Sequence, residues 1–184
     1  MTTPTATPTR AARTRGRGRG ILTPALYLLA TVRILIGFEF LWAFVDKAFG
    51  LGRNTPAEEA WTAGGSPTYG YLSAERALQD LFQPLAGVWI VDWLFMIGLL
   101  AVGIGLMAGI AMRASAVAGS LMLLFMWLAA FPIATNPFVN YNLTNALVVL
   151  ALFFLVGHMR LSLAGPWQRM TERLVGPKGA EWLK

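Results

Sequence analysis

Residues 85–107 read LAGVWIVDWLFMIGLLAVGIGLM, with Asp92 as the single charged residue of the stretch. A helix of roughly 20 apolar residues rises about 30 Å and crosses the hydrocarbon of a bilayer. Three further apolar stretches of similar length lie at residues 25–45, 114–131 and 138–157. Together the four stretches predict an all-α fold, an integral membrane bundle of four helices.

The composition excludes a soluble enzyme and several kinds of cofactor site. Of the 184 residues, 56% are hydrophobic and 13% charged, about half the charged fraction of a typical soluble domain. The chain has no cysteine, which excludes disulfides, cysteine-ligated zinc and iron–sulfur clusters. Its one histidine, His158, excludes a two-histidine haem site within a single copy. We therefore expect no haem or metal on this chain.

The two ends differ from the apolar middle and divide the chain into three parts. Residues 1–22 are rich in Thr, Pro, Gly and Arg and end in an Arg-Gly alternation, which predicts a disordered basic arm. Such an arm could bind nucleic acid, but beside a membrane helix we favour contact with anionic lipid and expect no nucleic-acid partner. Residues 23–165 form the predicted membrane domain, and residues 166–184 form a C-terminal tail.

Proline and glycine predict where the helices begin and end. Thr23-Pro24 predicts the N-cap and first residue of the first membrane helix. Ala164-Gly165-Pro166 predicts the end of the helical continuation of the fourth. Only a few residues, near 110–112, connect the second and third apolar stretches, so these two helices must form an antiparallel hairpin.

The long loop 46–84 has features of local structure. Thr55-Pro56-Ala57-Glu58 fits the capping-box pattern and predicts a short helix from Pro56 to about Trp61. Gly64-Gly65-Ser66-Pro67-Thr68 then predicts a turn. Because aromatic residues are common at membrane interfaces, we favour a cap over the end of the bundle, and a lid over a site is the alternative.

The distribution of lysine and arginine predicts the orientation. Five of the 15 lie in the N-terminal arm, five follow residue 157, and Arg113 lies between the second and third helices, which makes 11 on one side. Only Lys47, Arg53 and Arg76 lie on the other side, and Arg33 lies within the first helix. Cytoplasmic loops carry the excess of basic residues. We expect a multi-pass protein of a bacterial or archaeal plasma membrane with both termini cytoplasmic.

Small residues recur at helical spacing in the second and third apolar stretches: Ala101, Gly105, Gly109, Ser115 and Gly119. This pattern lets helix backbones approach closely in lipid. The contact could lie within one bundle or between copies, so a homo-oligomer is possible.

Polar side chains at membrane depth are the first candidates for a functional site, because a charge there costs at least ~2.5 kcal/mol. Glu39 and Asp92 lie roughly 10 Å below the outer ends of their helices, from a rise of about 1.5 Å per residue. The outer half also holds amides and indoles, whereas the inner half is nearly aliphatic apart from Arg33. We predict Glu39 and Asp92 as proton carriers and a set of binding residues: Arg33, Trp42, Asp46, Lys47, Trp93, Asn142 and Asn145.

Each of these residues also has a purely structural interpretation. Arg33 could extend its side chain to the cytoplasmic face, and Asp46 and Lys47 could form an interfacial ion pair. Asn142 and Asn145 could form hydrogen bonds across helices. For the outer layer as a whole we favour a site, because intramembrane ionisable groups usually serve a function.

The run Arg33–Gly52, RILIGFEFLWAFVDKAFGLG, resembles the opening helix of the DoxX/DoxD family. The resemblance continues through the Gly64–Thr68 turn, the Asp92-Trp93 pair, the segment 109–113 and Asn136-Pro137-Phe138, and so covers most of the chain beyond the basic arm. It implies a four-helix membrane protein. The name-giving members include the large subunit of a thiosulfate:quinone oxidoreductase, and others are linked to oxidative-stress and thiol-redox complexes.

The resemblance also implies a membrane quinone as co-substrate and a small redox partner subunit. Reduction of a quinone takes two protons and two electrons, and Glu39 and Asp92 could supply the protons. Lys47 and the two asparagines could bind quinone oxygens or an anionic substrate, Trp42 and Trp93 could stack on the ring, and Arg33 could stabilise a semiquinone.

Two other functions fit the sequence. The chain could be a non-enzymatic membrane subunit that anchors or assembles a redox partner, with docking through the basic tails and the amphipathic segment Pro166–Val175. It could also be a small proton-coupled carrier, since buried acids serve in proton relays. Four helices without a proline break at mid-depth make the carrier the weakest of the three.

Overall fold

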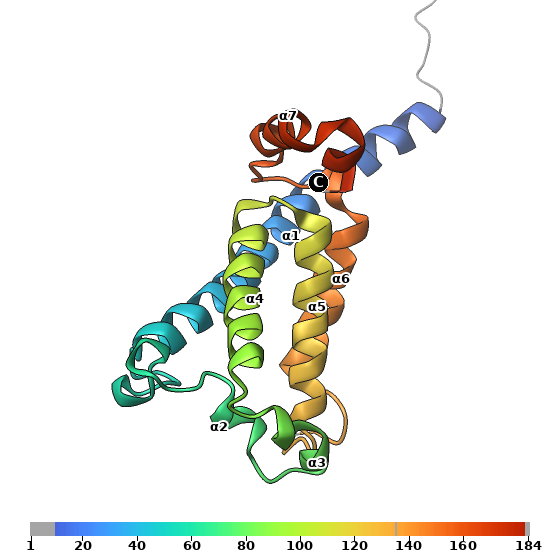
Figure 1. Ribbon diagram of the computed structural model, residues 1–184. Helices are drawn as coiled ribbons and strands as arrows, with labels where there is room; N and C mark the ends of the chain where they lie inside the picture. The colour runs from blue at the N-terminus through green and yellow to red at the C-terminus, as the bar shows by residue number, and fades with distance from the viewer. Residues whose placement is uncertain (1–9, 135, 183–184) are drawn as a thin grey trace, which may run out of the picture.

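The computed structural model describes residues 10–134 and 136–182, and this part of the chain is helical without strands (Figure 1). Five long helices form most of it: α1 (Arg10–Phe49), α4 (Trp89–Ala108), α5 (Met112–Ala129), α6 (Tyr141–Phe154) and α7 (Ala164–Trp182). Shorter elements occupy the connections: η1 (Ala57–Glu59), η2 (Trp61–Ala63), α2 (Tyr69–Leu72), α3 (Gln79–Phe82), η3 (Gln83–Leu85) and η4 (Val156–His158). The prediction of an all-α fold is confirmed.

Three of these helices are long and apolar enough to cross a membrane, namely the Thr23–Phe49 part of α1, α4 and α5. They suggest a membrane protein. The fourth apolar helix, α6, has 14 residues, which at about 1.5 Å per residue gives roughly 21 Å, less than the hydrocarbon thickness. The bundle of four membrane-spanning helices therefore stays a prediction.

The helices pack around one apolar core. In Figure 1, α4, α5 and α6 run side by side, and α1 crosses them at an angle and packs chiefly against α4. The Ser120 hydroxyl on α5 donates to the Ala146 carbonyl on α6 at 3.0 Å and ties these two helices together. The core side chains come from all four helices and include Ile36, Phe40, Met96, Val102, Leu106, Met112, Ala116, Val149 and Leu152.

Glycines set the distance between α1 and α4. A Cβ on Gly37 would lie 2.7 Å from the backbone nitrogen of Met107, and one on Gly103 would lie 2.8 Å from that of Leu41. Two glycines of the predicted small-residue pattern allow a similar approach. A Cβ on Gly105 would collide with the Ser115 side chain across the α4–α5 hairpin, and a Cβ on Gly119 would lie 2.9 Å from the Val102 side chain. The small residues therefore mediate close packing within one chain.

The Gly103→Ala substitution is expected to lower the free energy of unfolding by about 1–3 kcal/mol, because the added methyl group meets the α1 backbone and the two helices must separate. A titration with denaturing detergent, monitored by helicity, measures the change. Gly70→Ala is the matched control, since nothing lies within 4 Å of its Cβ position. Equal stability of the two variants would contradict the close approach of α1 and α4.

Both predicted proline boundaries differ from the structure. Helix α1 begins at Arg10 and passes through Pro24, so residues 10–22 of the predicted disordered arm are helical, while residues 1–9 lie outside the described residues. A proline removes one backbone hydrogen bond and can kink a helix without ending it. The apolar part of α1 nevertheless starts at Thr23, where the membrane helix was predicted to begin.

The prediction that Ala164-Gly165-Pro166 ends a helix is wrong, because these residues begin α7. Proline fits the first turn of a helix, where its missing N–H would have no intrahelical acceptor. The predicted C-terminal tail is therefore helical up to Trp182, with a break at Gly176, whose φ is 76°. The predicted domain boundary between residues 165 and 166 falls inside α7.

The predicted helix from Pro56 to Trp61 is replaced by the two 3-10 turns η1 and η2. The backbones of Pro56 and Ala60 are extended, which interrupts any continuous helix, and no side chain caps η1. Thr55, the predicted cap, is buried instead. The capping-box prediction is therefore wrong.

Candidate functional site

Asp92, in the first turn of α4, joins that helix to the long loop. Its side chain is 6% exposed. Oδ1 accepts hydrogen bonds from the Ser66 hydroxyl at 2.9 Å, the Thr68 hydroxyl at 2.5 Å and the Thr68 backbone N–H at 3.2 Å. A carboxylate in the first turn is also favoured by the helix dipole. The loop is thereby fixed over the N-terminal end of α4.

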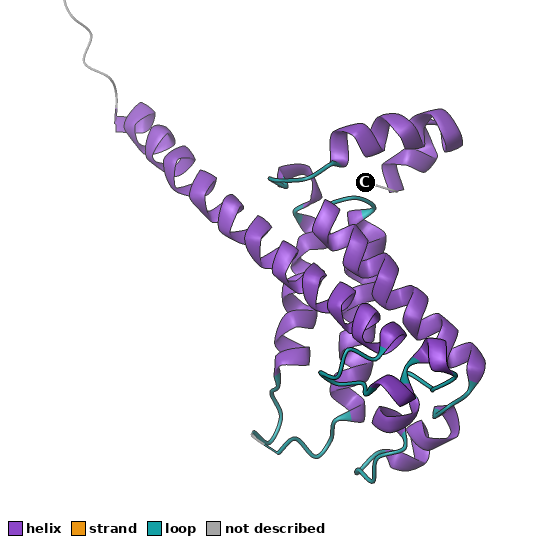
Figure 2. Cartoon of the chain, turned by 90° about the vertical axis from the view of Figure 1, so that its left-hand side faces the viewer, coloured by secondary structure: helices purple, strands orange, loops and turns teal. Residues whose placement is uncertain are grey.

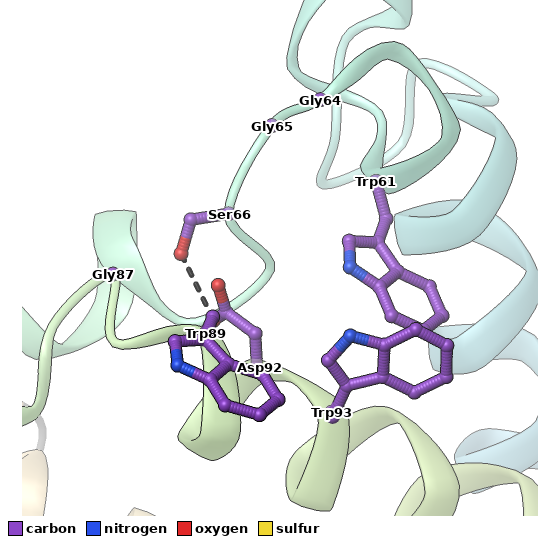
Figure 3. Close-up of a pocket in the computed structure, with 8 residues that line it drawn as sticks. All are labelled: Trp61, Gly64, Gly65, Ser66, Gly87, Trp89, Asp92 and Trp93. Atoms are coloured by element: carbon purple, nitrogen blue, oxygen red, sulfur yellow. Dashed lines mark hydrogen bonds between the residues drawn. The ribbon is translucent and has the colours of Figure 1, made fainter.

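A pocket of about 300 Å³ opens beside this carboxylate (Figure 3). Trp61 of η2 contacts Trp93 of α4 edge to face, with ring centroids 4.6 Å apart and an interplanar angle of 75°. Trp89 and Trp93 are 70% and 51% exposed, so the pocket is accessible from outside the bundle. Its lining consists of indoles, glycines and two polar side chains: Trp61, Gly64, Gly65, Ser66, Gly87, Trp89, Asp92 and Trp93.

The two consecutive glycines of the pocket are required by the backbone. Gly64 has φ 91°, in the left-handed region that disfavours other residues. A Cβ on Gly65 would collide with the backbone carbonyl of Glu59. The turn therefore brings the loop backbone close enough for Ser66 and Thr68 to reach Asp92.

Past the pocket, the loop continues over the end of α5. The Tyr71 hydroxyl donates to the Met126 carbonyl at 2.8 Å, and Arg76 Nη1 donates to the Ala129 carbonyl at 2.8 Å. These bonds satisfy carbonyls that the helix end leaves without intrahelical donors. Burial raises the pKa of Tyr71, while the neighbouring Arg76 acts in the opposite direction, so the phenol stays protonated at neutral pH. The loop thus covers the ends of α4 and α5 on one side of the bundle.

Asp46, at the C-terminal end of α1, stabilises a turn. It is 1% exposed, and its two oxygens accept the backbone N–H groups of Arg53 at 3.2 Å and Asn54 at 2.9 Å. The neighbouring Lys47 is half-buried. The arrangement supports a structural role for Asp46.

Glu39 and the two asparagines form a second polar group, between α1 and α6. Asn145 Nδ2 donates to Glu39 Oε2 at 3.2 Å on an exposed part of the helix surface. Asn142 is 2% exposed, and its Oδ1 has no hydrogen-bond partner among the described residues. Trp42 stacks on Phe38 of the same helix, with ring centroids 6.1 Å apart.

Arg33 lies apart from both groups, where α1 meets the α4–α5 turn. Its side chain is fully buried. Nη2 donates to the Leu161 carbonyl at 2.7 Å, Nη1 lies 3.9 Å from the Met112 sulfur, and Nε has no partner among the described residues. Nη2 also lies 3.5 Å from the Arg160 carbonyl, so Arg33 fixes the chain that follows η4 against α1.

The structure therefore divides the predicted outer layer. Asp92 and Trp93 belong to the pocket, Glu39 pairs with Asn145, and no hydrogen bond between described residues joins the two acids. The sequence prediction missed four lining or clamping residues: Trp61, Ser66, Thr68 and Trp89. The Gly-Gly-Ser-Pro-Thr turn was the sequence signal for these residues, but the helix that the turn approaches depends on tertiary packing.

Within residues 10–134 and 136–182, no three histidine or carboxylate groups converge where they could hold a metal ion.

Comparison of the chain with protein-family models, with curated proteins and with solved structures finds no match. The DoxX/DoxD resemblance thus rests on the short sequence motifs given above. The redox partner, the thiosulfate chemistry and the quinone that it implies stay predictions.

Proposed function

We propose that the chain is a four-span plasma-membrane subunit of DoxX type, with both termini cytoplasmic, whose pocket binds the ring of a membrane quinone. The observation that carries this proposal is the pocket of about 300 Å³ in which indoles surround the buried carboxylate of Asp92. Ligand sites are typically concave and apolar with a few convergent polar groups. A quinone needs a flat aromatic surface for its ring and a proton donor for its oxygens.

The pocket provides both kinds of group. Trp61 and Trp93 offer indole faces and edges to a ring, and Asp92 is the ionisable group within reach. The hydroxyls of Ser66 and Thr68 hold Asp92 Oδ1 in place while its proton is exchanged with the quinone. Glu39, bonded to Asn145, is a second carboxyl on the α1–α6 side. A small partner subunit supplies the electrons, as in a thiosulfate:quinone oxidoreductase.

Access from lipid supports the same ligand class. A quinone reaches its site through the bilayer with an isoprenoid tail attached, so its pocket must open sideways. Trp89 and Trp93 stand exposed at the start of α4, at the level where aromatic side chains meet lipid headgroups.

The test is the quinone-to-protein ratio in organic extracts of detergent-purified protein, measured by mass spectrometry. The wild type is expected to retain near-stoichiometric quinone. Trp61→Ala/Trp93→Ala is expected to lower the ratio to about half, because the loss of aromatic contacts of up to ~1.5 kcal/mol weakens binding about tenfold and takes a site from about 90% to about 50% occupancy. Trp42→Ala, which removes an indole outside the pocket, is the matched control and is expected to retain the wild-type ratio.

Two results would overturn the proposal. One is the absence of quinone above the lipid background in the wild type, and the other is an unchanged ratio in the pocket variant. Either result would favour the anchor or assembly subunit as the function of this chain.

A further inference from the structure

Helix α7 is held across the end of the bundle opposite the long loop. Figures 1 and 2, turned by 90° from each other, both show it running across that end. The Leu163 N–H donates to the Ala108 carbonyl at 2.8 Å, and Arg113 Nη1 donates to the Glu181 carbonyl at 2.9 Å. Ala108 ends α4, and Arg113 lies in the first turn of α5. Because both helices are long enough to span a bilayer, their ends place α7 at the membrane surface.

The part of α7 before the break at Gly176 has one buried side chain. Thr171 is 4% exposed and its hydroxyl is bonded to the Trp167 carbonyl within the helix. Trp167 and Gln168 are half-buried. Thr171, Trp167 and Gln168 therefore mark the less exposed side of this part of α7, and the exposed residues mark the opposite side.

The uncovered side carries two parallel rows of side chains. Arg169 and Arg173, four residues apart, form the first row, and Pro166, Met170 and Leu174 form the second at the same spacing. Met170 and Leu174 are 47% and 74% exposed. The five residues line a shallow hollow of about 430 Å³, and we name this surface the basic-apolar face of α7.

The two guanidinium groups are available for a ligand. Among the described residues neither has a hydrogen-bond or ion-pair partner, and the nearby Glu172 carboxylate accepts from Gln168 at 3.1 Å. Arginine binds phosphate oxygens through several N–H groups at once. A phosphate bound to the arginine row would lie directly beside the apolar row. A phospholipid has the same arrangement, with a charged headgroup next to apolar acyl chains.

We propose that the basic-apolar face of α7 binds anionic phospholipid of the membrane that α4 and α5 cross. Arg169 and Arg173 contact the phosphate groups, and Met170 and Leu174 enter the boundary between headgroups and acyl chains, as in interfacial amphipathic helices. The depth of α7, set by Ala108 and Arg113, favours lipid over a soluble partner, because the apolar row lies at the level of the bilayer surface. This binding is independent of the quinone pocket at the other end of the bundle.

The test uses the full-length chain in vesicles. Because the sequence has no cysteine, Leu174→Cys introduces a single thiol for a fluorescent label. The vesicles contain phosphatidylcholine and increasing fractions of phosphatidylglycerol, both with brominated acyl chains, so that the bromine density stays constant and quenching reports contact of the label with lipid. Quenching is expected to rise with the phosphatidylglycerol fraction. The apparent affinity for this lipid is expected to fall about fivefold for each of Arg169→Gln and Arg173→Gln.

The matched control is Arg53→Gln, which removes one exposed positive charge at the opposite end and is expected to leave the affinity unchanged. Met170→Cys serves as a second label position, in case the first label disturbs the helix. Three outcomes would overturn the proposal: no quenching at any lipid composition, equal quenching without phosphatidylglycerol, or an affinity that neither arginine variant changes.

Discussion

Replacement of Arg33 by alanine is expected to lower the free energy of unfolding by about 3–5 kcal/mol. The side chain is fully buried, so its removal leaves a cavity between α1 and the α4–α5 turn. It also removes the donor to the Leu161 carbonyl, whose 2.7 Å bond holds the segment between η4 and α7 in place. Titration with denaturing detergent, followed by helicity, measures the loss.

Two further variants separate the cavity from the hydrogen bond. Arg33→Met fills most of the volume without a donor and is expected to cost about 1–3 kcal/mol, the penalty for an unsatisfied buried acceptor. Arg53→Ala removes an exposed arginine and is expected to change stability by less than about 0.5 kcal/mol. If Arg33→Ala were as stable as Arg53→Ala, a structural role for the buried guanidinium would be contradicted.

Replacement of Asp92 by alanine is expected to release the long loop and to lower the free energy of unfolding by about 2–4 kcal/mol. Three donors, the hydroxyls of Ser66 and Thr68 and the Thr68 N–H, lose their common acceptor. A buried donor left without a partner costs about 1–3 kcal/mol, and water entering the opened pocket recovers part of that cost. Limited proteolysis of the loop and detergent unfolding measure the two effects.

Asp92→Asn distinguishes the structural role of this side chain from its proposed chemical role. The amide keeps an oxygen acceptor for the loop, so most of the stability and the protease resistance should return, but it cannot exchange a proton. Asp80→Ala, at an exposed position of helix α3, is the matched control for loss of a loop carboxylate. Equal protease resistance of Asp92→Ala and Asp80→Ala would show that Asp92 does not fix the loop.

The long helices could be predicted from the sequence because length and apolar composition alone determine them. Helices α4 and α5 match the predicted apolar stretches to within a few residues. Proline was ambiguous, since the same residue is compatible with a first turn, an interior kink or the segment after a helix. Both Pro24 and Pro166 were therefore placed incorrectly relative to their helices.

The candidate site could not be predicted in depth or in position around the bundle. The predicted depth of roughly 10 Å for both acids is wrong, because α4 begins at Trp89 and α1 ends at Phe49. At about 1.5 Å per residue, Asp92 lies about 4.5 Å inside its helix and Glu39 about 15 Å inside its own. Glu39 lies against α6, whereas Asp92 is enclosed by the loop. The approach of Ser66 and Thr68 to α4 depends on how α1, η2 and α4 pack together, which no local pattern encodes.

The contact between Arg33 and Leu161 also constrains how the protein is made. These two residues are 128 positions apart, so the ribosome releases the arginine long before the carbonyl that receives its hydrogen bond. During that interval the first helix carries an uncompensated charge, which weakens its insertion into lipid. The hydrogen bond between Arg33 and Leu161 therefore forms only after the segment that follows η4 has been synthesised.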